Sequence, residues 1–249
     1  GRGGERSGFG HDNHREDDEA AEAAVPADDP LPGGAYMGTV FHEVLERVDF
    51  SEAAEGRGIL EAATRSLDRN LPAYMRREGE RFAPEIARIV RNTLSADISG
   101  EGLVLGRIAK RVHEVEFHVP VSARTRDGRE IAAGEGFVTG FIDMVFEHGG
   151  KYYLLDWKSN HLPGGYGPEE LARCMDESRY VLQYRIYAAA LLRYLGLRLD
   201  SFDYERHFGG IYYVFLRGVD PAKPGSGVFF YRPSGEAEIR GYEGDFSGE

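Results

Sequence analysis

The stretch GFIDMVFEHGGKYYLLDWKSN (residues 140–160) places Asp143, Asp156 and Lys158 inside runs that are otherwise apolar and aromatic. Two short runs of β-branched and aromatic residues flank HGG, a turn signal, so the stretch predicts an antiparallel β-hairpin. Because side chains two residues apart in a strand share a face, Asp156 and Lys158 are expected to point the same way. Pairing of the two strands around the turn brings Asp143 toward Asp156.

Two carboxylates this close repel each other unless a proton or a cation lies between them. Their oxygen atoms suit Mg²⁺, Mn²⁺ or Ca²⁺, and a lysine beside such an ion can position water for the hydrolysis of a phosphodiester. A structural interpretation stays open, in which Asp156 and Lys158 form a salt bridge at a strand end and Asp143 caps a bulge. An isolated D-x-K favours that interpretation, and the second aspartate on the paired strand favours a site.

Helical periodicity precedes the hairpin, and a second helical stretch follows it. In residues 31–98 two apolar stripes at helical spacing predict a helical part. The stripes are Phe41, Val44, Leu45 and Val48, and Ile86, Ile89, Val90 and Leu94. Residues 168–197 predict one further helix, and GGIYYVFLRGV (209–219) predicts a buried strand.

A strand, a helix and another strand form a crossover unit, so the strand in 209–219 is expected to run parallel to KYYLLDWK (151–158). Residues 99–235 are therefore predicted to form an α/β core. The predicted fold class is α/β, with a mixed β-sheet flanked by helices and a helical segment at the N-terminus.

Composition narrows the class of protein. The chain has 249 residues, of which 41% are hydrophobic and 29% charged, which is typical of a globular protein. It has neither a signal-peptide pattern nor an apolar run long enough to span a bilayer. The single cysteine, Cys174, excludes a disulfide framework, a cysteine zinc site and a cysteine-ligated iron–sulfur cluster. A cytoplasmic location is expected.

The formal charge of -12 is concentrated at one end of the chain. Residues 1–30 contain nine acids and three arginines, a net charge of -6, and few large apolar residues. This composition predicts a disordered acidic tail or linker, with residues 31–249 forming the folded domain. Because the chain starts inside such a segment without an initiator methionine, we expect it to be a piece of a longer protein.

Several motifs, in order, resemble those of the RecB-like nucleases of the PD-(D/E)XK superfamily. The resemblance spans about residues 36–233 and implies a restriction-endonuclease-like fold. It is carried by GTVFHEVLERVDF (38–50), GFIDMVF (140–146), LLDWKSN (154–160), YVLQYRIYAAALLRYL (180–195), FDYERHFGGIYYVFLRGVD (202–220) and GVFFYRP (227–233). The usual form of the family has Tyr at the position of Trp157, a conservative change.

The resemblance implies roles for individual residues. Asp143 and Asp156 match the metal-binding and catalytic aspartates, and Lys158 matches the catalytic lysine. His42 matches the histidine that completes the metal site. The family also has an acidic residue before the first aspartate. The resemblance favours Glu114 for this position, and Glu116 is a second candidate. For either residue, a place on a solvent-exposed strand edge without a role in the site is an open alternative.

The motif QYRIY (183–187) places Gln183 and Tyr187 four residues apart, on one face of a helix. It resembles the Q-x-x-x-Y motif of these nucleases, which implies a place beside the active site in contact with DNA. A tyrosine packed in the core and a glutamine at the helix surface is the alternative. Arg185 adds a positive charge for contact with the DNA backbone.

The activity implied is that of a Mg²⁺-dependent DNA exonuclease or endonuclease, similar to exodeoxyribonuclease V, in double-strand break repair and homologous recombination. Mn²⁺ is an expected substitute, and Ca²⁺ is expected to bind without supporting turnover. The implied partners are RecC, RecD and RecA. The chain has no P-loop, so ATP is expected to act only through a helicase part that this chain lacks. Two alternatives stay open: a non-catalytic module that binds DNA or docks RecA or RecC, and a stand-alone nuclease.

Overall fold

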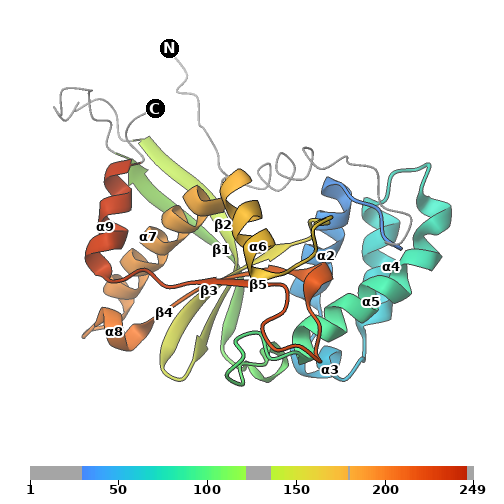
Figure 1. Cartoon of the computed structure of the whole chain (residues 1–249), viewed down its shortest axis with the longest axis horizontal. Coiled ribbons are helices and arrows are strands. Elements are labelled where there is room, and N and C mark those ends of the chain that lie inside the picture. Colours follow the sequence, from blue (N-terminus) through green and yellow to red (C-terminus); the bar gives the residue numbers. More distant parts are fainter. Residues whose placement is uncertain (1–29, 122–135, 179, 246–249) are drawn as a thin grey trace, which may run out of the picture.

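The computed structural model describes residues 30–121, 136–178 and 180–245, and every structural statement below concerns these residues. The predicted tail (1–30) lies, except for its last residue, outside the described residues. A five-stranded mixed sheet in the order β1-β2-β3-β4-β5 forms the centre of the protein (Figure 1). Its strands are β1 (Arg111–Val121), β2 (Gly136–His148), β3 (Lys151–Lys158), β4 (Phe208–Phe215) and β5 (Val228–Tyr231).

The predicted hairpin is confirmed. Strands β2 and β3 pair antiparallel, from Met144 opposite Leu155 to His148 opposite Lys151. The two-residue turn consists of Gly149 and Gly150, whose φ angles are 60° and 80°. Both positions need positive φ, which glycine adopts without the steric cost of a Cβ atom, so this turn fixes the register that places Asp143 next to β3.

The predicted crossover is also confirmed, because β3 and β4 pair parallel, with Asp156 opposite Tyr213. The single helix predicted over residues 168–197 is wrong in one respect. The segment forms two helices, α6 (Pro168–Glu177) and α7 (Tyr180–Arg198). Helix α6 ends at Glu177, and the backbone N–H of the next residue, Ser178, still donates to Cys174 O. No glycine or proline marks this break, so composition alone does not reveal it.

Helices from the N-terminal part cover one face of the sheet (Figure 1). They are α2 (Ala35–Arg47), α3 (Phe50–Ala54), α4 (Ile59–Asn70) and α5 (Gly79–Ser95), with 3₁₀ turns at Arg76–Glu78 and Leu105–Arg107. Both predicted stripes lie in the core between these helices and the sheet, except Val48, which is only partly buried. The sheet contributes Met144, Leu155 and Trp157 to the same core.

Helix α7 covers the other face, together with α6 and α9 (Glu236–Asp245). The short helix α8 (Tyr204–His207) leads into β4, and a 3₁₀ turn at Leu216–Gly218 follows it. Every residue of β4 is buried, which explains its continuous apolar sequence. The α/β fold class, with a mixed sheet flanked by helices and an N-terminal helical segment, is thus confirmed.

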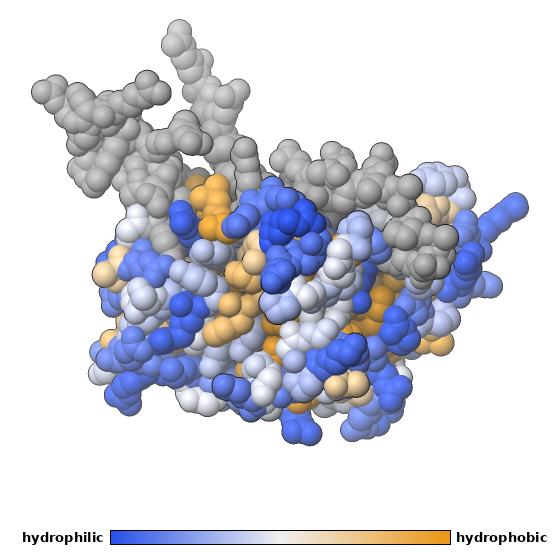
Figure 2. Space-filling view, viewed as in Figure 1, coloured by the Kyte–Doolittle hydropathy of each residue, from blue (hydrophilic) through white to orange (hydrophobic). Residues whose placement is uncertain are grey.

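The surface is mainly hydrophilic on the face drawn in Figure 2, where hydrophobic side chains form separate small areas. None of the described helices is both long and apolar enough to cross a membrane.

Candidate active site

Three carboxylates form a row across three neighbouring strands. The pairs His113–Met144 and Val115–Ile142 flank Glu114 and Asp143, so these two residues lie opposite each other on β1 and β2. The register of β2 and β3 continues the row to Asp156. The backbone N–H of Trp157 donates to Asp143 Oδ2 at 2.7 Å, which holds the central carboxylate against β3.

The sheet is distorted at this row. Glu114 has φ 51° and is the only non-glycine residue with positive φ in the described part of the chain. The regular pairing of β1 with β2 runs through His113 and resumes at Val115, so the ladder is interrupted at Glu114. A non-glycine residue in this conformation costs about 1–3 kcal/mol, and such residues cluster at functional sites.

His42 approaches the row of carboxylates from α2, one of the N-terminal helices that cover one face of the sheet. It lies on α2, directly after the buried Phe41, and its Nδ1 is 3.5 Å from Asp143 Oδ1. His42, Glu114 and Asp143 each offer one ligand atom, and these atoms all lie within 4.8 Å of one another. One imidazole and two carboxylates fit a divalent ion such as Mg²⁺ or Mn²⁺.

This group differs from the ligand set that the sequence implied, because Glu114 takes part in it and Asp156 does not. Asp156 instead pairs with Lys158, whose Nζ lies 2.9 Å from Asp156 Oδ2. Both side chains are buried, with 2% and 5% of their surface exposed. The salt bridge of the structural interpretation is therefore present, and by itself it fits a structural or a catalytic role.

The surroundings of Lys158 go beyond a simple salt bridge. Its Nζ donates to Gln183 Oε1 at 3.2 Å and lies 3.8 Å from the centre of the Tyr180 ring. Burial opposes the charge, but attraction to Asp156 and to Tyr180 outweighs burial and raises the pKa of Lys158 above its ordinary value. Lys158 is therefore a fixed cation beside the carboxylate row.

Of the predicted DNA-binding residues on α7, Gln183 is the one with a hydrogen bond to Lys158. Gln183 Nε2 donates to the Tyr187 hydroxyl at 3.0 Å, as their i, i+4 spacing allows. Tyr187 is buried and packs edge-on against Phe117, with ring centres 5.4 Å apart. Gln183 and Arg185 are half-buried. The pair therefore fits part of each interpretation of this motif. Tyr187 is packed in the core, as in the structural interpretation, whereas Gln183 contacts Lys158, as expected of a residue beside the active site.

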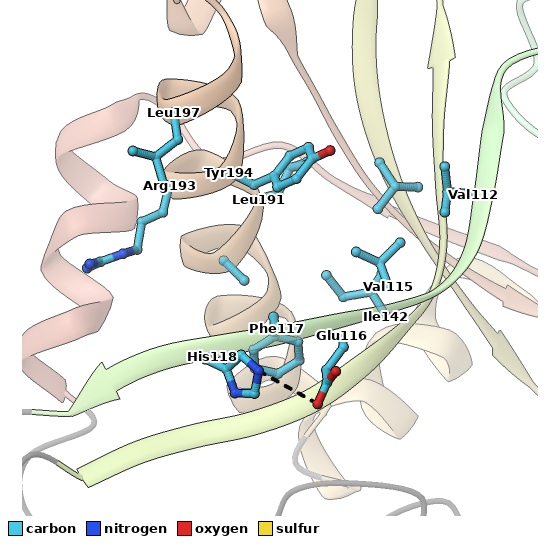
Figure 3. A pocket seen from close by; sticks show the side chains of 12 residues that line it. Val112, Val115, Glu116, Phe117, His118, Ile142, Leu191, Arg193, Tyr194 and Leu197 are labelled. Atoms are coloured by element: carbon cyan, nitrogen blue, oxygen red, sulfur yellow. Dashed lines mark ion pairs between the residues drawn. The ribbon is translucent and has the colours of Figure 1, made fainter.

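Glu116, the second candidate for the acidic position, lies outside the row. Its side chain is exposed, and its Oε1 is 3.6 Å from His118 Nε2. Figure 3 shows this pair on β1, at one end of the groove that Tyr194 and Leu197 of α7 also line. Among the described residues, only Glu114 of the two belongs to the group of ligand atoms around His42.

Sequence reasoning missed two further polar residues: Tyr213, which is buried and contacts the site, and Arg217, which is half-buried and lies near the end of β3. The Tyr213 hydroxyl donates to Gln183 Oε1 at 3.0 Å. Arg217 donates from Nε to Ser159 O at 2.8 Å, and its terminal nitrogens donate to Leu31 O and Pro32 O at 3.1 and 2.7 Å. Arg217 thus joins the end of β3 to the segment that enters α2. The only sequence feature that pointed to Tyr213 or Arg217 was the presence of a polar group within the apolar run 209–219.

The open choice between the two glutamates can be tested by metal binding. We expect Glu114→Gln to weaken Mn²⁺ binding by about tenfold or more, a loss that even outer-shell groups can cause. Glu116→Gln, two residues away on the same strand, should bind Mn²⁺ like the unaltered protein. Calorimetric titration of both variants with Mn²⁺ measures this. A weakened Glu116→Gln beside an unaffected Glu114→Gln would reverse the assignment.

Comparison with known proteins adds an independent finding. The family model of the PD-(D/E)XK nuclease superfamily matches residues 18–240. The RecBCD enzyme subunit RecB of Escherichia coli (strain K12) is 33% identical over 249 residues, which cover 88% of this chain and 20% of that protein. RecB of Haemophilus influenzae is 33% identical over 83% of the chain and 18% of its own length. RecB of Mycobacterium tuberculosis is 29% identical over 82% of the chain and 23% of its own. The chain thus spans about a fifth of the length of these relatives.

Proposed function

Because this chain belongs to the PD-(D/E)XK nuclease superfamily, we propose that it hydrolyses DNA phosphodiester bonds with Mg²⁺ as an exodeoxyribonuclease V-like nuclease. The observation that carries the proposal is the juxtaposition of the row Glu114, Asp143 and Asp156 with His42 on one side and Lys158 on the other. The similarity to RecB subunits over most of the chain supports a nuclease of the RecB family.

His42, Glu114 and Asp143 are the residues proposed to hold the ion, and Asp156, next in the row, is proposed to complete the site from β3. Oxygen ligands with one imidazole suit Mg²⁺, with Mn²⁺ as a substitute and Ca²⁺ as a non-productive occupant. A bound ion supplies Lewis-acid polarisation of a phosphoryl oxygen. The carboxylates hold water and orient it toward phosphorus.

In the proposed reaction, the oxygen of water forms a bond to phosphorus and the bond from phosphorus to the leaving oxygen breaks. Water loses one proton, and the leaving oxygen gains one. Negative charge increases at the phosphoryl oxygens in the transition state, and a fixed cation next to them stabilises it. Lys158 is proposed for this role because its ammonium is held by Asp156 and Gln183 rather than free to move.

DNA is proposed to run along the start of α7. Gln183 is half-buried and contacts Lys158, so DNA bound at the lysine would reach it, and the half-buried Arg185 follows two positions later on α7. Arg185 suits contact with phosphate, which makes binding dependent on salt. Tyr187 is only 7% exposed, so we propose that it acts at DNA through Gln183.

The relatives named above are subunits of the RecBCD enzyme, and this chain covers a fifth of their length. We therefore propose a cytoplasmic role in RecBCD-type double-strand break repair and recombination, with RecC, RecD and RecA as partners. Unwinding and the use of ATP are assigned to the remainder of such a subunit.

The test is cleavage of end-labelled linear DNA. We expect fragments in the presence of Mg²⁺, none after addition of a chelator, and full recovery when Mg²⁺ is restored. A parallel binding measurement with the same DNA in Ca²⁺ separates a nuclease from a binding module. Tight binding without cleavage in Mg²⁺ or Mn²⁺ would replace the nuclease proposal with that of a non-catalytic DNA-binding domain.

A further inference from the structure

Tyr213 lies at the centre of β4 and is fully buried. In the parallel register it stands opposite Asp156 of β3, one strand further along the carboxylate row. Its hydroxyl is the only polar group of its side chain. It donates to Gln183 Oε1 at 3.0 Å, and the backbone oxygen of Tyr180 is a more distant acceptor at 3.5 Å. A hydroxyl in the middle of a buried strand costs stability unless it is hydrogen-bonded, so the shorter contact, with Gln183, is informative.

Gln183 Oε1 accepts two hydrogen bonds at once, from the Tyr213 hydroxyl and from Lys158 Nζ at 3.2 Å. Its Nε2 donates to the Tyr187 hydroxyl at 3.0 Å. An ammonium group has only donors, so the amide contacts Lys158 productively only with its oxygen turned inward. A flipped amide would turn its NH₂ group toward the lysine. The second donor, from Tyr213, stabilises the inward orientation.

The orientation of the amide matters because it determines where the ammonium points. Asp156 and Gln183 together take two of the three N–H groups of Lys158 and thereby fix the direction of the third. The rings of Tyr180 and Tyr213 lie 3.8 and 5.4 Å from Nζ and limit its remaining freedom. Holding a group within the reacting geometry can be worth a large part of a rate enhancement.

We propose that Tyr213 is a positioning residue for the nuclease reaction, acting through Gln183 to hold the ammonium of Lys158 in place. This inference rests on the proposed function, because it needs Lys158 to act on the substrate. The chain of contacts runs from Tyr213 on β4 through Gln183 on α7 to Lys158 on β3. These two hydrogen bonds connect β4, α7 and β3 around the amide of Gln183.

The first test is Tyr213→Phe, which removes the hydroxyl and keeps the ring. We expect kcat on linear DNA to fall about tenfold, the equivalent of one buried hydrogen bond, with KM and Mn²⁺ affinity unchanged. Tyr204→Phe is the matched control, because Tyr204 is also buried and donates its hydroxyl to a backbone oxygen, that of Pro233, at the other end of β4. It should keep the unaltered kcat although it loses a buried hydrogen bond as well.

A double-mutant cycle separates positioning from mere stability. If Tyr213 acts through Gln183, then Gln183→Leu and the double variant with Tyr213→Phe should have the same kcat. Multiplying losses, or an unchanged kcat in either single variant, would overturn the inference. Should Tyr213→Phe be unstable, the cycle is measured at a lower temperature at which that variant is folded, with the unaltered protein assayed beside it. Lys158→Ala in the same assay separates a failure of the proposed function from a failure of this inference. If Lys158→Ala cleaves normally, the proposed function fails. If Lys158→Ala is inactive while Tyr213→Phe is fully active, only the role of Tyr213 is removed.

Discussion

Lys158→Ala is expected to lower the rate of DNA cleavage at saturating Mg²⁺ by about a hundredfold or more, the usual cost of losing one group that stabilises transition-state charge. Metal binding should be retained, because the substitution removes none of the ligand atoms that His42, Glu114 and Asp143 offer. DNA affinity in Ca²⁺ should fall little, since one phosphate contact among several is lost. Single-turnover cleavage and a binding titration measure the two effects separately.

Stability has to be measured with this variant, because Lys158 is the partner of a buried carboxylate. Removing one member of a buried ion pair typically costs about 3–5 kcal/mol, so Lys158→Ala should lower the melting temperature. Lys158→Gln keeps an N–H donor toward Asp156 and provides a folded variant without the charge. Lys151→Ala, at the other end of the same strand, is the matched control and should cleave normally. Cleavage by Lys158→Gln at the unaltered rate would leave the salt bridge with a structural role alone.

The parts of the fold that depend on neighbours in sequence could be predicted. The hairpin followed from HGG between two runs with strand composition, and Asp143 consequently came beside Asp156. The parallel strand followed from the handedness and length of a crossover. The break between α6 and α7 could not be predicted, because no helix-breaking residue marks it.

The site was predictable only in part, because contacts between residues that are distant in sequence leave no local pattern. His42 approaches Asp143 from a helix about a hundred residues earlier in the chain, and only the family resemblance pointed to it. The preference for Glu114 over Glu116 rests on the position of its carboxylate near His42 and Asp143, which no residue pattern encodes. Tyr213 and Arg217 lie in a run that reads as a buried strand, so their hydroxyl and guanidinium had no visible partners.

Asp143 is the residue on which the site depends most, because it is the centre of the carboxylate row and also the neighbour of His42. Asp143→Asn keeps the shape of the side chain and an oxygen that can accept from the Trp157 N–H. It removes one negative charge from between Glu114 and Asp156. We expect Mn²⁺ affinity and the cleavage rate each to fall by about a hundredfold or more, since a charged ligand to a hard cation contributes several kcal/mol.

The same substitution makes an opposite prediction for stability without metal. Like charges in a row repel one another, so neutralising the central one should leave the melting temperature of the metal-free protein unchanged or raise it. Ligand binding stabilises a fold by RT ln(1 + L/Kd), where L is the free ligand concentration, so at a Mn²⁺ concentration near the Kd of the unaltered protein the rise in melting temperature should disappear in Asp143→Asn. Glu147→Gln is the matched control, because Glu147 lies on the same strand but pairs with Lys110. It should keep the Mn²⁺-dependent rise. If Asp143→Asn also keeps it, then the ion binds elsewhere, and the carboxylate row is a structural feature of the sheet rather than a metal site.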